Sequence, residues 1–431
     1  MTGSPAPRLH VRTREVGLHD LAHDDLLAHT SPAAPLAWLR RGEGIVGVAP
    51  VVTRLDVGPD SPEPRAQALA RAWAELAAQA DIDDPVDVPG TGLVGFAALP
   101  FDERSAAGAS IVVPSLIVGR RGGRAWLTSI RRDTEADADT DTDAKTLPEP
   151  IAYEPYWSAT LGPGALDPDG YQSAVRGALE AIATGEAGKI VVARDLVGTV
   201  PEDADLRRLI HELSTGYPDT WTYAVDGIIG ASPETLATVH DGRVTARVLA
   251  GTRPRGADAT QDAASRAALT ASAKDLDEHA YAVHSVVASL TGHTTGLTVD
   301  EHPFTLELPN VWHLATDVAG TLSDGATSLD LIQALHPTAA VAGTPTAAAV
   351  EAIRRLEPFD RRRYAGPVGW IDQHGDGEWA IALRCAQFDA PVGGVMPVVA
   401  HAGAGIVAGS DPESELLETR VKFRPIVDAL A

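Results

Sequence analysis

Helix-like and strand-like segments follow one another without a regular period after about residue 167. Apolar residues recur at helical spacing from Tyr171 to Ile182, and a β-branched strand follows at 189–194. Further strands are expected near 219–239, 243–249, 366–372, 377–387 and 396–408, with one helix near 258–292. A doubly wound or barrel α/β fold alternates strands and helices regularly. The order of the elements therefore argues against both folds.

The first 150 residues mix apolar, strand-like runs with one clear helix, at about 64–80. An acidic, low-complexity segment follows at about 133–145. Its aspartates have loosely the spacing of a calcium loop, but the glycine and the terminal glutamate of such a loop are absent. We expect this segment to be a mobile surface loop. The chain has no GxGxxG motif after a strand and no GxxxxGKS or GxxxxGKT loop, so neither dinucleotide binding nor P-loop chemistry is indicated.

The composition is that of a soluble globular protein, with 44% hydrophobic and 22% charged residues in 431. The net charge of −24 repels nucleic acid and anionic membranes, so we expect neither as a partner. An anionic substrate would need local cations or a metal. The sequence has no apolar run long enough to span a bilayer, no signal-like N-terminus and one cysteine, Cys385, so we expect a cytoplasmic protein.

A run of small residues near the C-terminus, at 402–409, leads through a Ser-Asp-Pro turn into a helix-like segment. On a helix, Glu415, Glu418 and Lys422 lie at i, i+3 and i+7 and share one face. Two carboxylates and an ammonium beside a backbone that a ligand can approach closely suggest a site for a divalent metal and an organic anion. The alternative is a solvated helix face with an ordinary ion pair.

Two charged residues next to apolar strands could act as base and acid. Lys189 begins its strand after a glycine-containing turn, and a partly desolvated lysine can serve as a general base near neutral pH. Glu234 lies between apolar segments, and a carboxyl in an apolar pocket tends to stay protonated and can act as a general acid. The alternatives are a solvated lysine at a strand end and a turn glutamate exposed to water.

Three further features could belong to a site. Asp275 and Glu278 share a face of the expected helix and form a second carboxylate pair suited to Mg²⁺, unless that face is merely solvated. Arg384 ends an otherwise apolar strand, where an arginine is costly unless it is paired with a carboxylate of the protein or a substrate. His313 has apolar neighbours, and its default role is that of a satisfied core histidine.

Taken together, these segments resemble the chorismate-utilising enzymes, the family of isochorismate, salicylate, anthranilate and aminodeoxychorismate synthases. The resemblance covers about 167–427 and is carried, in order, by the Lys189 strand, SPET, LAGTRPRG, SAKDLDEH, NVWHL, LHPTAAVAGTP, YAGPVGW, GDGEWAIALRCA and AGAGIVAGSDPESELLET. It implies an α+β fold in which two large, mostly antiparallel sheets pack as a sandwich, with helices outside and the site in a cleft between the sheets. On this basis 165–431 is the chorismate-binding catalytic region, and 1–150 is the N-terminal α+β portion of the same single unit.

Three positions favour isochorismate synthase within this family. Isochorismate and salicylate synthases carry a lysine at the position of Lys189, where anthranilate synthases typically have glutamine. Aminodeoxychorismate synthases typically use a lysine where this chain has Ala250, and salicylate and anthranilate synthases usually place a threonine near Ala340. The resemblance therefore implies a Mg²⁺-dependent isochorismate synthase whose product feeds menaquinone or siderophore biosynthesis. The alternatives are a salicylate synthase, an anthranilate synthase component I and a catalytically silent homologue.

The resemblance also implies roles for individual residues. Water would add at C2 of the chorismate ring as the C4 hydroxyl departs, with Lys189 as the base for the water and Glu234 as the acid for the leaving hydroxyl. Mg²⁺ would bind the ring carboxylate and be held by Glu278, Glu415 and Glu418, with Asp275 acting through water. The substrate-binding residues implied are Gly251, Thr252, His313, Ala340, Tyr364, Arg384, Gly403, Ala404, Gly405 and Lys422. We expect chorismate as the small-molecule substrate, no glutaminase subunit, and a monomer.

Overall fold

The strands of this protein pair into one continuous network in which nearly every pair is antiparallel, and two layers of it meet at β6 (Ala109–Arg121). The structure is a computed structural model that describes residues 7–21, 25–133, 147–307, 311–323 and 325–431. One edge of β6 pairs with β3 (Glu43–Val57), while its other edge pairs first with β5 (Val94–Ala98) and then with β7 (Arg124–Arg132). The order of hydrogen-bonded strands therefore branches at β6: β7 and β3 continue one layer, and β5 begins the other.

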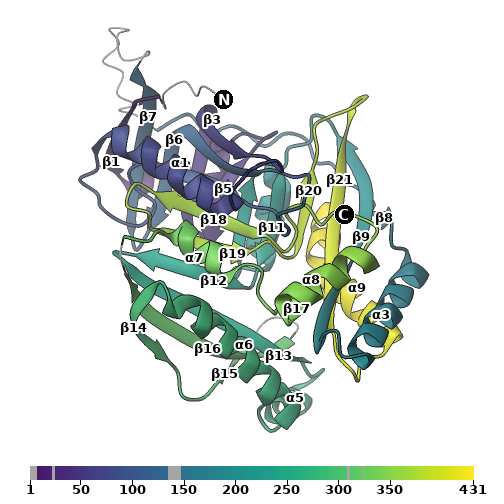
Figure 1. The fold of residues 1–431 in the computed structure, drawn as a ribbon. Coiled ribbons are helices and arrows are strands. Elements are labelled where there is room, and N and C mark those ends of the chain that lie inside the picture. Colours follow the sequence, from purple (N-terminus) through teal and green to yellow (C-terminus); the bar gives the residue numbers. More distant parts are fainter. Residues whose placement is uncertain (1–6, 22–24, 134–146, 308–310, 324) are drawn as a thin grey trace.

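The first layer runs through the N-terminal strands and ends in the C-terminal ones (Figure 1). Its order is β4 (Asp81–Asp83), β1 (Leu9–Val16), β7, β6, β3, β2 (Leu36–Arg40), β10 (Trp221–Val225), β11 (Ile228–Ser232), β20 (Cys385–Phe388), β21 (Val395–Ile406) and β9 (Lys189–Pro201), with β8 (Gly162–Pro163) and β17 (Gly343–Thr344) on β9. Only the β1–β4 pair is parallel among the described strands.

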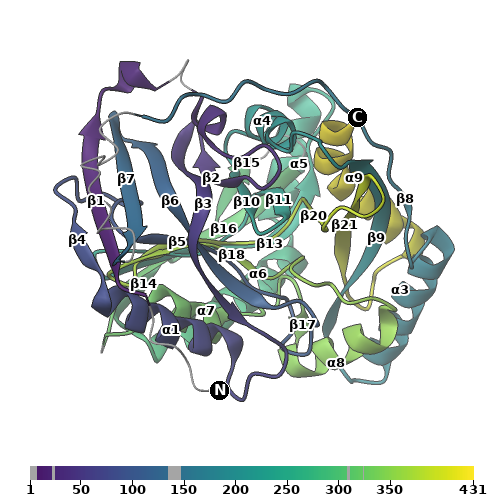
Figure 2. The ribbon, with the colours of Figure 1, turned by 90° about the horizontal axis from the view of Figure 1, so that it is seen from above.

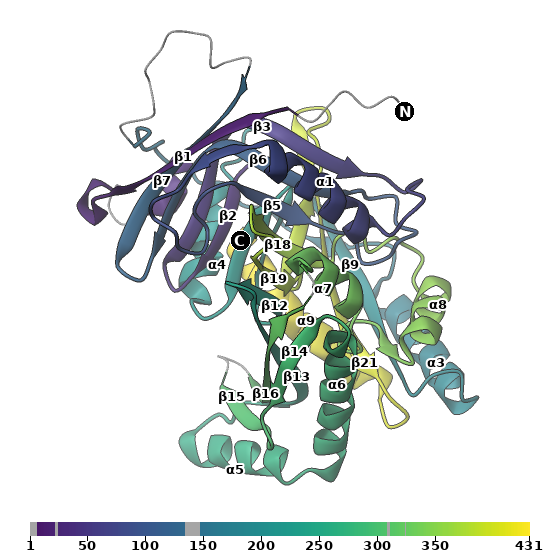
Figure 3. The ribbon, with the colours of Figure 1, turned by 60° about the vertical axis from the view of Figure 1, so that its left-hand side comes forward.

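The second layer starts at β5 and ends in a subdomain that projects downward in Figure 3. Its order is β5, β18 (Pro367–Asp372), β19 (Gly377–Ile381), β12 (Thr235–His240), β13 (Arg243–Pro254) and β16 (Val311–Leu322), with β14 (Thr294–Val299) and β15 (Phe304–Glu307) pairing along β16. β5 and β18 join the N-terminal and C-terminal parts of the chain within this layer.

The two layers face each other across one apolar core that contains buried tryptophans from both. Trp38 of β2 and Trp370 of β18 both donate indole N–H hydrogen bonds to the Glu378 carboxylate, at 2.9 and 3.1 Å. Arg121 pairs with the same carboxylate at 2.8 Å, so the buried charge is compensated. A strand whose alternate residues are apolar must bury that face against another layer. This packing confirms the predicted α+β sandwich with helices outside.

Helices cover the outer faces of both layers (Figure 2). The first layer contacts α3 (Pro168–Ala183), α4 (Arg207–Gly216), α8 (Thr346–Leu356) and α9 (Pro412–Leu430), and the second contacts α5 (Ala259–Thr270), α6 (Ala273–Thr291) and α7 (Ser328–Leu335). α1 (Arg65–Gln79) packs on β3, β6 and α7, and the short 3₁₀ helices are η1 (Leu18–Asp20) and η3 (Leu26–His29). No helix of the described residues is long and apolar enough to cross a bilayer.

The C-terminal helix α9 shows why these segments fold as they do. Asp411 accepts a hydrogen bond from the Ser414 backbone N–H, and Pro412 occupies the first turn, where its missing N–H costs nothing. Leu416, Phe423 and Ile426 recur at helical spacing and are buried toward β21 and α4. The neighbouring stripe of the helix, which carries the predicted site residues, is thereby fixed beside the end of β21.

Three expected elements are divided in the structure. The helix expected near 258–292 is α5 and α6, because the Ser272 side chain caps a new helix by accepting from the Asp275 N–H. The strand expected near 219–239 is β10, β11 and β12, with a hairpin turn at Asp226-Gly227, whose φ angles are 50° and 80°. The strand expected near 377–387 breaks at Arg384. The acidic segment near 133–145 lies almost wholly outside the described residues.

Candidate active site

Two of the connections between the layers of the sandwich each carry a predicted site residue. Glu234 lies where β11 of the first layer leads into β12 of the second, and Arg384 lies where β19 returns to β20. Ser232 joins the two connections, because its hydroxyl donates to Ile381 O at 2.6 Å and accepts from Glu234 N at 3.2 Å. Arg384 has φ 49°, and its carbonyl accepts from Ala231 N at 3.1 Å. The crossing points thus hold Glu234 and Arg384 in fixed backbone positions.

Lys189 begins β9, next to the glycine-containing end of β21. The register of these two strands places Gly405 opposite Val191 and Gly403 opposite Ala193, with the buried Ala404 between the two glycines. A Cβ atom on Gly405 would lie 2.8 Å from Lys189 Cε and 3.5 Å from Nζ. Gly405 therefore provides the space in which the Lys189 side chain lies.

Lys422 joins α9 to β21. Its ammonium donates to Gly403 O at 2.8 Å and lies 2.5 Å from the Glu418 carboxylate, one turn earlier on the helix. Half of the Glu418 side chain is exposed, so this ion pair is partly screened by solvent. The predicted face of Glu415, Glu418 and Lys422 is thus directed at the backbone of the small-residue run rather than only at water.

The electrostatics place three cations around Glu234. Burial raises the pKa of Glu234 to about 7, although Lys189, Lys422 and Arg384 each lower it. The pKa of Glu418 is instead below its ordinary value: burial raises it, but Lys422, Arg384 and Lys189 together outweigh that effect. One glutamate of the site is therefore able to hold a proton near neutral pH while the other is a carboxylate, which is the division that acid catalysis beside a charged site requires.

His313 and Thr252 face each other on paired strands, β16 and β13. The Thr252 hydroxyl and His313 Nδ1 are 2.8 Å apart. Burial, together with Arg384 and Lys422, lowers the pKa of His313 to about 4. Gly251, with φ 78°, forms a bulge just before Thr252, and His279 of α6 hydrogen-bonds to Ala250 O at 3.1 Å. The bulge and the buried His279 fix this corner of the site.

The remaining predicted substrate-binding residues lie around the same centre. Tyr364 is buried and its ring stacks on His401, with 5.2 Å between the ring centroids. Burial lowers the pKa of Arg384, an effect that Tyr364 and Glu418 oppose. Ala340 lines a small cavity together with Glu234. Residues from widely separated segments of the chain therefore act on one another electrostatically around Glu234 and Arg384.

The predicted metal ligands are oxygen donors on α6 and α9. Asp275 packs against Gly251 at the start of α6, and its carboxylate lies 3.7 Å from the Arg253 guanidinium. Glu415 lies near enough to Tyr171 to raise the pKa of that phenol, together with burial and Glu418. The Glu278 side chain lies outside the described residues. The carboxylates of Asp275, Glu415 and Glu418 are not all within 4.8 Å of one another.

A buried ion pair beneath the site was not predicted from the sequence. Glu357 and Arg361 pair at 2.6 Å, and both side chains are almost fully buried. Glu357 also accepts from Ala193 N at 2.7 Å, and Arg361 donates to Val191 O and Val341 O at 2.8 and 2.9 Å. The pair therefore ties β9 to the loop that carries Ala340. The signal in the sequence is only two charges four residues apart, which is also the pattern of an exposed helix pair.

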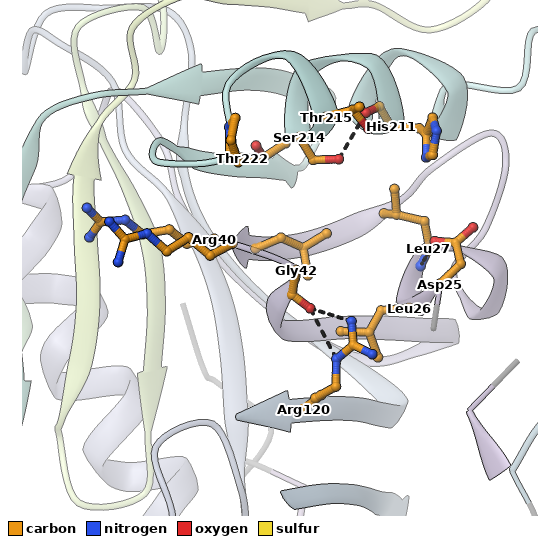
Figure 4. Close-up of a pocket in the computed structure, with 13 residues that line it drawn as sticks. Asp25, Leu26, Leu27, Arg40, Gly42, Arg120, His211, Ser214, Thr215 and Thr222 are labelled. Atoms are coloured by element: carbon orange, nitrogen blue, oxygen red, sulfur yellow. Dashed lines mark hydrogen bonds between the residues drawn. The ribbon is translucent and has the colours of Figure 1, made fainter. Parts of the chain in front are cut away.

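A separate pocket of about 300 Å³ lies between η3, β2 and α4 and contains none of the predicted site residues (Figure 4). Arg120 donates two hydrogen bonds to Gly42 O there, at 3.2 and 2.6 Å. The Arg40 guanidinium instead lies over the Trp221 ring, 4.9 Å from its centroid. The predicted residues that interact with Glu234 are absent from the lining of this pocket.

Comparison with known proteins decides the family. A family model described as chorismate binding enzyme matches residues 41–431. This chain is a chorismate-binding enzyme. The match extends well into the N-terminal part, which carried none of the sequence motifs.

Named relatives of this chorismate-binding enzyme include isochorismate synthases. The isochorismate synthase DhbC of Bacillus subtilis is 41% identical over 276 residues, covering 61% of this chain and 68% of that protein. The isochorismate synthase EntC of Escherichia coli K12 is 32% identical over 378 residues, covering 86% and 88%. The solved structure of MenF, the menaquinone-specific isochorismate synthase of Escherichia coli, has a TM-score of 0.78 at 26% identity and covers 100% and 97%.

Proposed function

We propose that this chorismate-binding enzyme is an isochorismate synthase that interconverts chorismate and isochorismate. The observation that carries the proposal is that Lys189, Arg384 and Lys422 all act electrostatically on the buried Glu234, whose pKa is raised to about 7. The named relatives at 32–41% identity support the same reaction. A dianionic substrate needs local cations in a protein whose net charge is −24, and these three supply them.

Lys189 and Glu234 divide the proton chemistry. In the forward direction Lys189 takes a proton from water as the water oxygen forms a bond to C2 of the ring. The ring double bonds shift, the C4–oxygen bond breaks, and Glu234 donates its proton to the departing hydroxyl, which leaves as water. Burial keeps Glu234 protonated up to about neutral pH, so the acid is available when the substrate binds.

Several other residues hold the substrate rather than react with it. Arg384 and the backbone around Gly403 would bind the enolpyruvyl carboxylate, with Tyr364 beside them, and Lys422 would bind near the ring carboxylate. Burial and two cations keep His313 neutral, so it can line the ring without adding charge. Ala340 lies next to Glu234, so the site lacks the threonine that the lyase-competent relatives usually place there.

Mg²⁺ is part of the proposal. The proposed ligands are four carboxylates, those of Asp275, Glu278, Glu415 and Glu418, and Mg²⁺ prefers oxygen donors. Because Mg²⁺ usually keeps several of its water ligands, the four carboxylates need not all lie close together. When bound, Mg²⁺ would supply positive charge for the ring carboxylate. We further propose that the enzyme works as a monomer without a glutaminase.

The test is an incubation of the purified protein with chorismate and Mg²⁺, with the products separated by chromatography. Isochorismate as the single product, abolished by EDTA and unaffected by ammonium, supports the proposal. Salicylate with pyruvate would assign the enzyme to the lyase-competent branch of the family. Anthranilate formed only with ammonium would show that Lys189 does not activate water, and no turnover in any condition would contradict enzymatic activity.

A further inference from the structure

The proposed reaction leaves the two catalytic groups in the wrong protonation states after each turnover. Lys189 has gained the proton of the attacking water, and Glu234 has lost its own to the departing hydroxyl. Chorismate and isochorismate carry the same number of protons, so nothing in the products restores Glu234. Before the next forward reaction, Glu234 must regain one proton and Lys189 must release one.

A narrow cavity reaches Glu234 from the side of α6 and the loop after α7. It is about 30 Å³ in volume and is lined by Glu234, β12, β13, α6 and Thr338–Ala340, so it can hold one or two water molecules. Lys189, Arg384 and Lys422 do not line it. Arg247 does, but its guanidinium is paired with Asp317 at 2.6 Å. The cavity thus approaches Glu234 apart from the cations that would hold the substrate.

Thr338 is the polar residue that distinguishes this cavity. Its hydroxyl oxygen is buried and has no hydrogen-bond partner among the described residues. A buried hydroxyl without a partner costs free energy, and one bridging water would satisfy it. The cavity is also lined by Ser285, an exposed residue of α6, so Ser285, Thr338 and Glu234 all lie on the wall of one cavity.

We propose that this cavity holds water and that the Thr338 hydroxyl relays a proton through it from solvent to the Glu234 carboxylate after each turnover. The hydroxyl accepts a hydrogen bond from the water on the solvent side and donates one toward Glu234, so one proton enters and one is passed on. Lys189 returns its proton to solvent on the substrate side. This inference rests on the proposed function and adds Thr338 to it as a positioning residue that does not touch the substrate.

The test compares the first turnover with the steady state in Thr338→Val, which keeps the shape of the side chain and removes the hydroxyl. At pH 6 and low buffer concentration Glu234 is protonated before mixing, so the first turnover should run at the wild-type rate. Later turnovers should slow by about tenfold, less than the roughly 10²–10⁴-fold expected for a group that acts on the substrate itself. Because a slow step after the chemistry lowers kcat and KM together, kcat/KM for chorismate should stay the same, and Thr338→Ser should restore the steady-state rate.

Two controls separate the relay from a structural effect. Thr270→Val makes the same change on α5, outside the cavity, and should leave both phases unchanged. Ala282→Val narrows the cavity from the side of α6. It should likewise give a first turnover at the wild-type rate and slower later turnovers, even if Thr338→Val folds poorly. A first turnover slowed as much as the steady state, or a steady state equal to that of wild type, would overturn the relay. Wild-type protein that makes no isochorismate would instead overturn the proposed function.

Discussion

Thr252 and His313 are joined by a hydrogen bond of 2.8 Å between the threonine hydroxyl and His313 Nδ1. The pair lies beside the bulge at Gly251, on the paired strands β13 and β16. Because burial and two cations lower the pKa of His313 to about 4, the imidazole is neutral at physiological pH. In the proposed mechanism, the neutral histidine therefore shapes the site and is not its acid or base.

The neutral state of His313 can be measured directly. We expect its ring resonances, followed by NMR, to show no protonation between pH 6 and pH 8, and the pH dependence of the reaction to contain no contribution from this histidine. The unfolded protein serves as the reference, because a solvated histidine titrates near 6.5. A titration of His313 in that same range would contradict the assigned electrostatics.

Removal of the proposed base should affect turnover far more than binding. Lys189→Ala is expected to reduce kcat by about 10²–10⁴-fold, the usual worth of a positioned acid or base. The KM for chorismate should change much less, because Arg384 and Lys422 remain. Steady-state kinetics with chorismate and Mg²⁺ provide the measurement. Near-normal turnover in this variant would remove Lys189 from the mechanism.

Gly405 offers a way to displace Lys189 without removing it. In Gly405→Ala the new Cβ would lie 2.8 Å from Lys189 Cε, and the flexible end of the lysine would move away. We expect kcat to fall by about 10–100-fold with little loss of stability, since a small displacement of a catalytic group has a large effect.

Gly409→Ala is the matched control for this change. Its added Cβ would meet no atom within 4 Å, so both rate and stability should stay close to those of wild type. Equal activities of the two alanine variants would show that the position of Lys189 next to Gly405 is not required.

The raised pKa of Glu234 has a consequence for stability. The folded protein holds this proton up to about pH 7, whereas the unfolded chain releases it near 4.5. Between these values the folded state binds more protons, so stability falls as the pH rises. Glu234→Gln removes this loss. Relative to wild type, the variant should gain about 2–3 kcal/mol in the free energy of unfolding between pH 5 and pH 8.

Denaturant titrations of wild type and Glu234→Gln at both pH values measure this gain, because the other titrating groups are common to the two proteins. A difference in unfolding free energy that is the same at pH 5 and pH 8 would show that Glu234 has an ordinary pKa. The same variant should also lose most of its turnover, since glutamine cannot donate a proton to the leaving hydroxyl.

Mg²⁺ dependence tests the proposed ligands on α6. Glu278→Gln should weaken the apparent affinity for Mg²⁺ by at least about tenfold, because an amide oxygen replaces a charged one. Asp277→Asn is the matched control, since Asp277 is an exposed residue of the same helix and, two positions from Asp275, lies on a different face from it. Activity measured against Mg²⁺ concentration reports both. An unchanged titration in Glu278→Gln would exclude it as a ligand.

The sequence alone pointed to charged residues that cost free energy to place beside apolar segments. Arg384 at the end of an apolar strand and Glu234 between apolar segments both proved to lie at crossings between the two layers. Lys189 was recognisable by its place at a strand start. In each of these cases one short segment contained the whole signal, and the resemblance to the family supplied the roles.

Other features depend on contacts between distant segments and could not be predicted. The spacing of Glu357 and Arg361 in the sequence indicates that they can pair, but it does not indicate that the pair is buried beneath β9. The importance of Gly405 depends on Lys189, which lies on another strand. The cavity beside Thr338 is formed by four separate segments. The continuous strand network likewise depends on β5 pairing with β18, across more than half of the chain.

The central claim is that water, activated at Lys189, supplies the new hydroxyl at C2. Turnover of chorismate in water labelled with oxygen-18, followed by mass spectrometry of the isochorismate formed at early times, tests this most directly. The account predicts that each isochorismate carries one labelled oxygen and that the unreacted chorismate carries none. Isochorismate without the label would show that the hydroxyl moves within the substrate, and would contradict the roles assigned to Lys189 and Glu234.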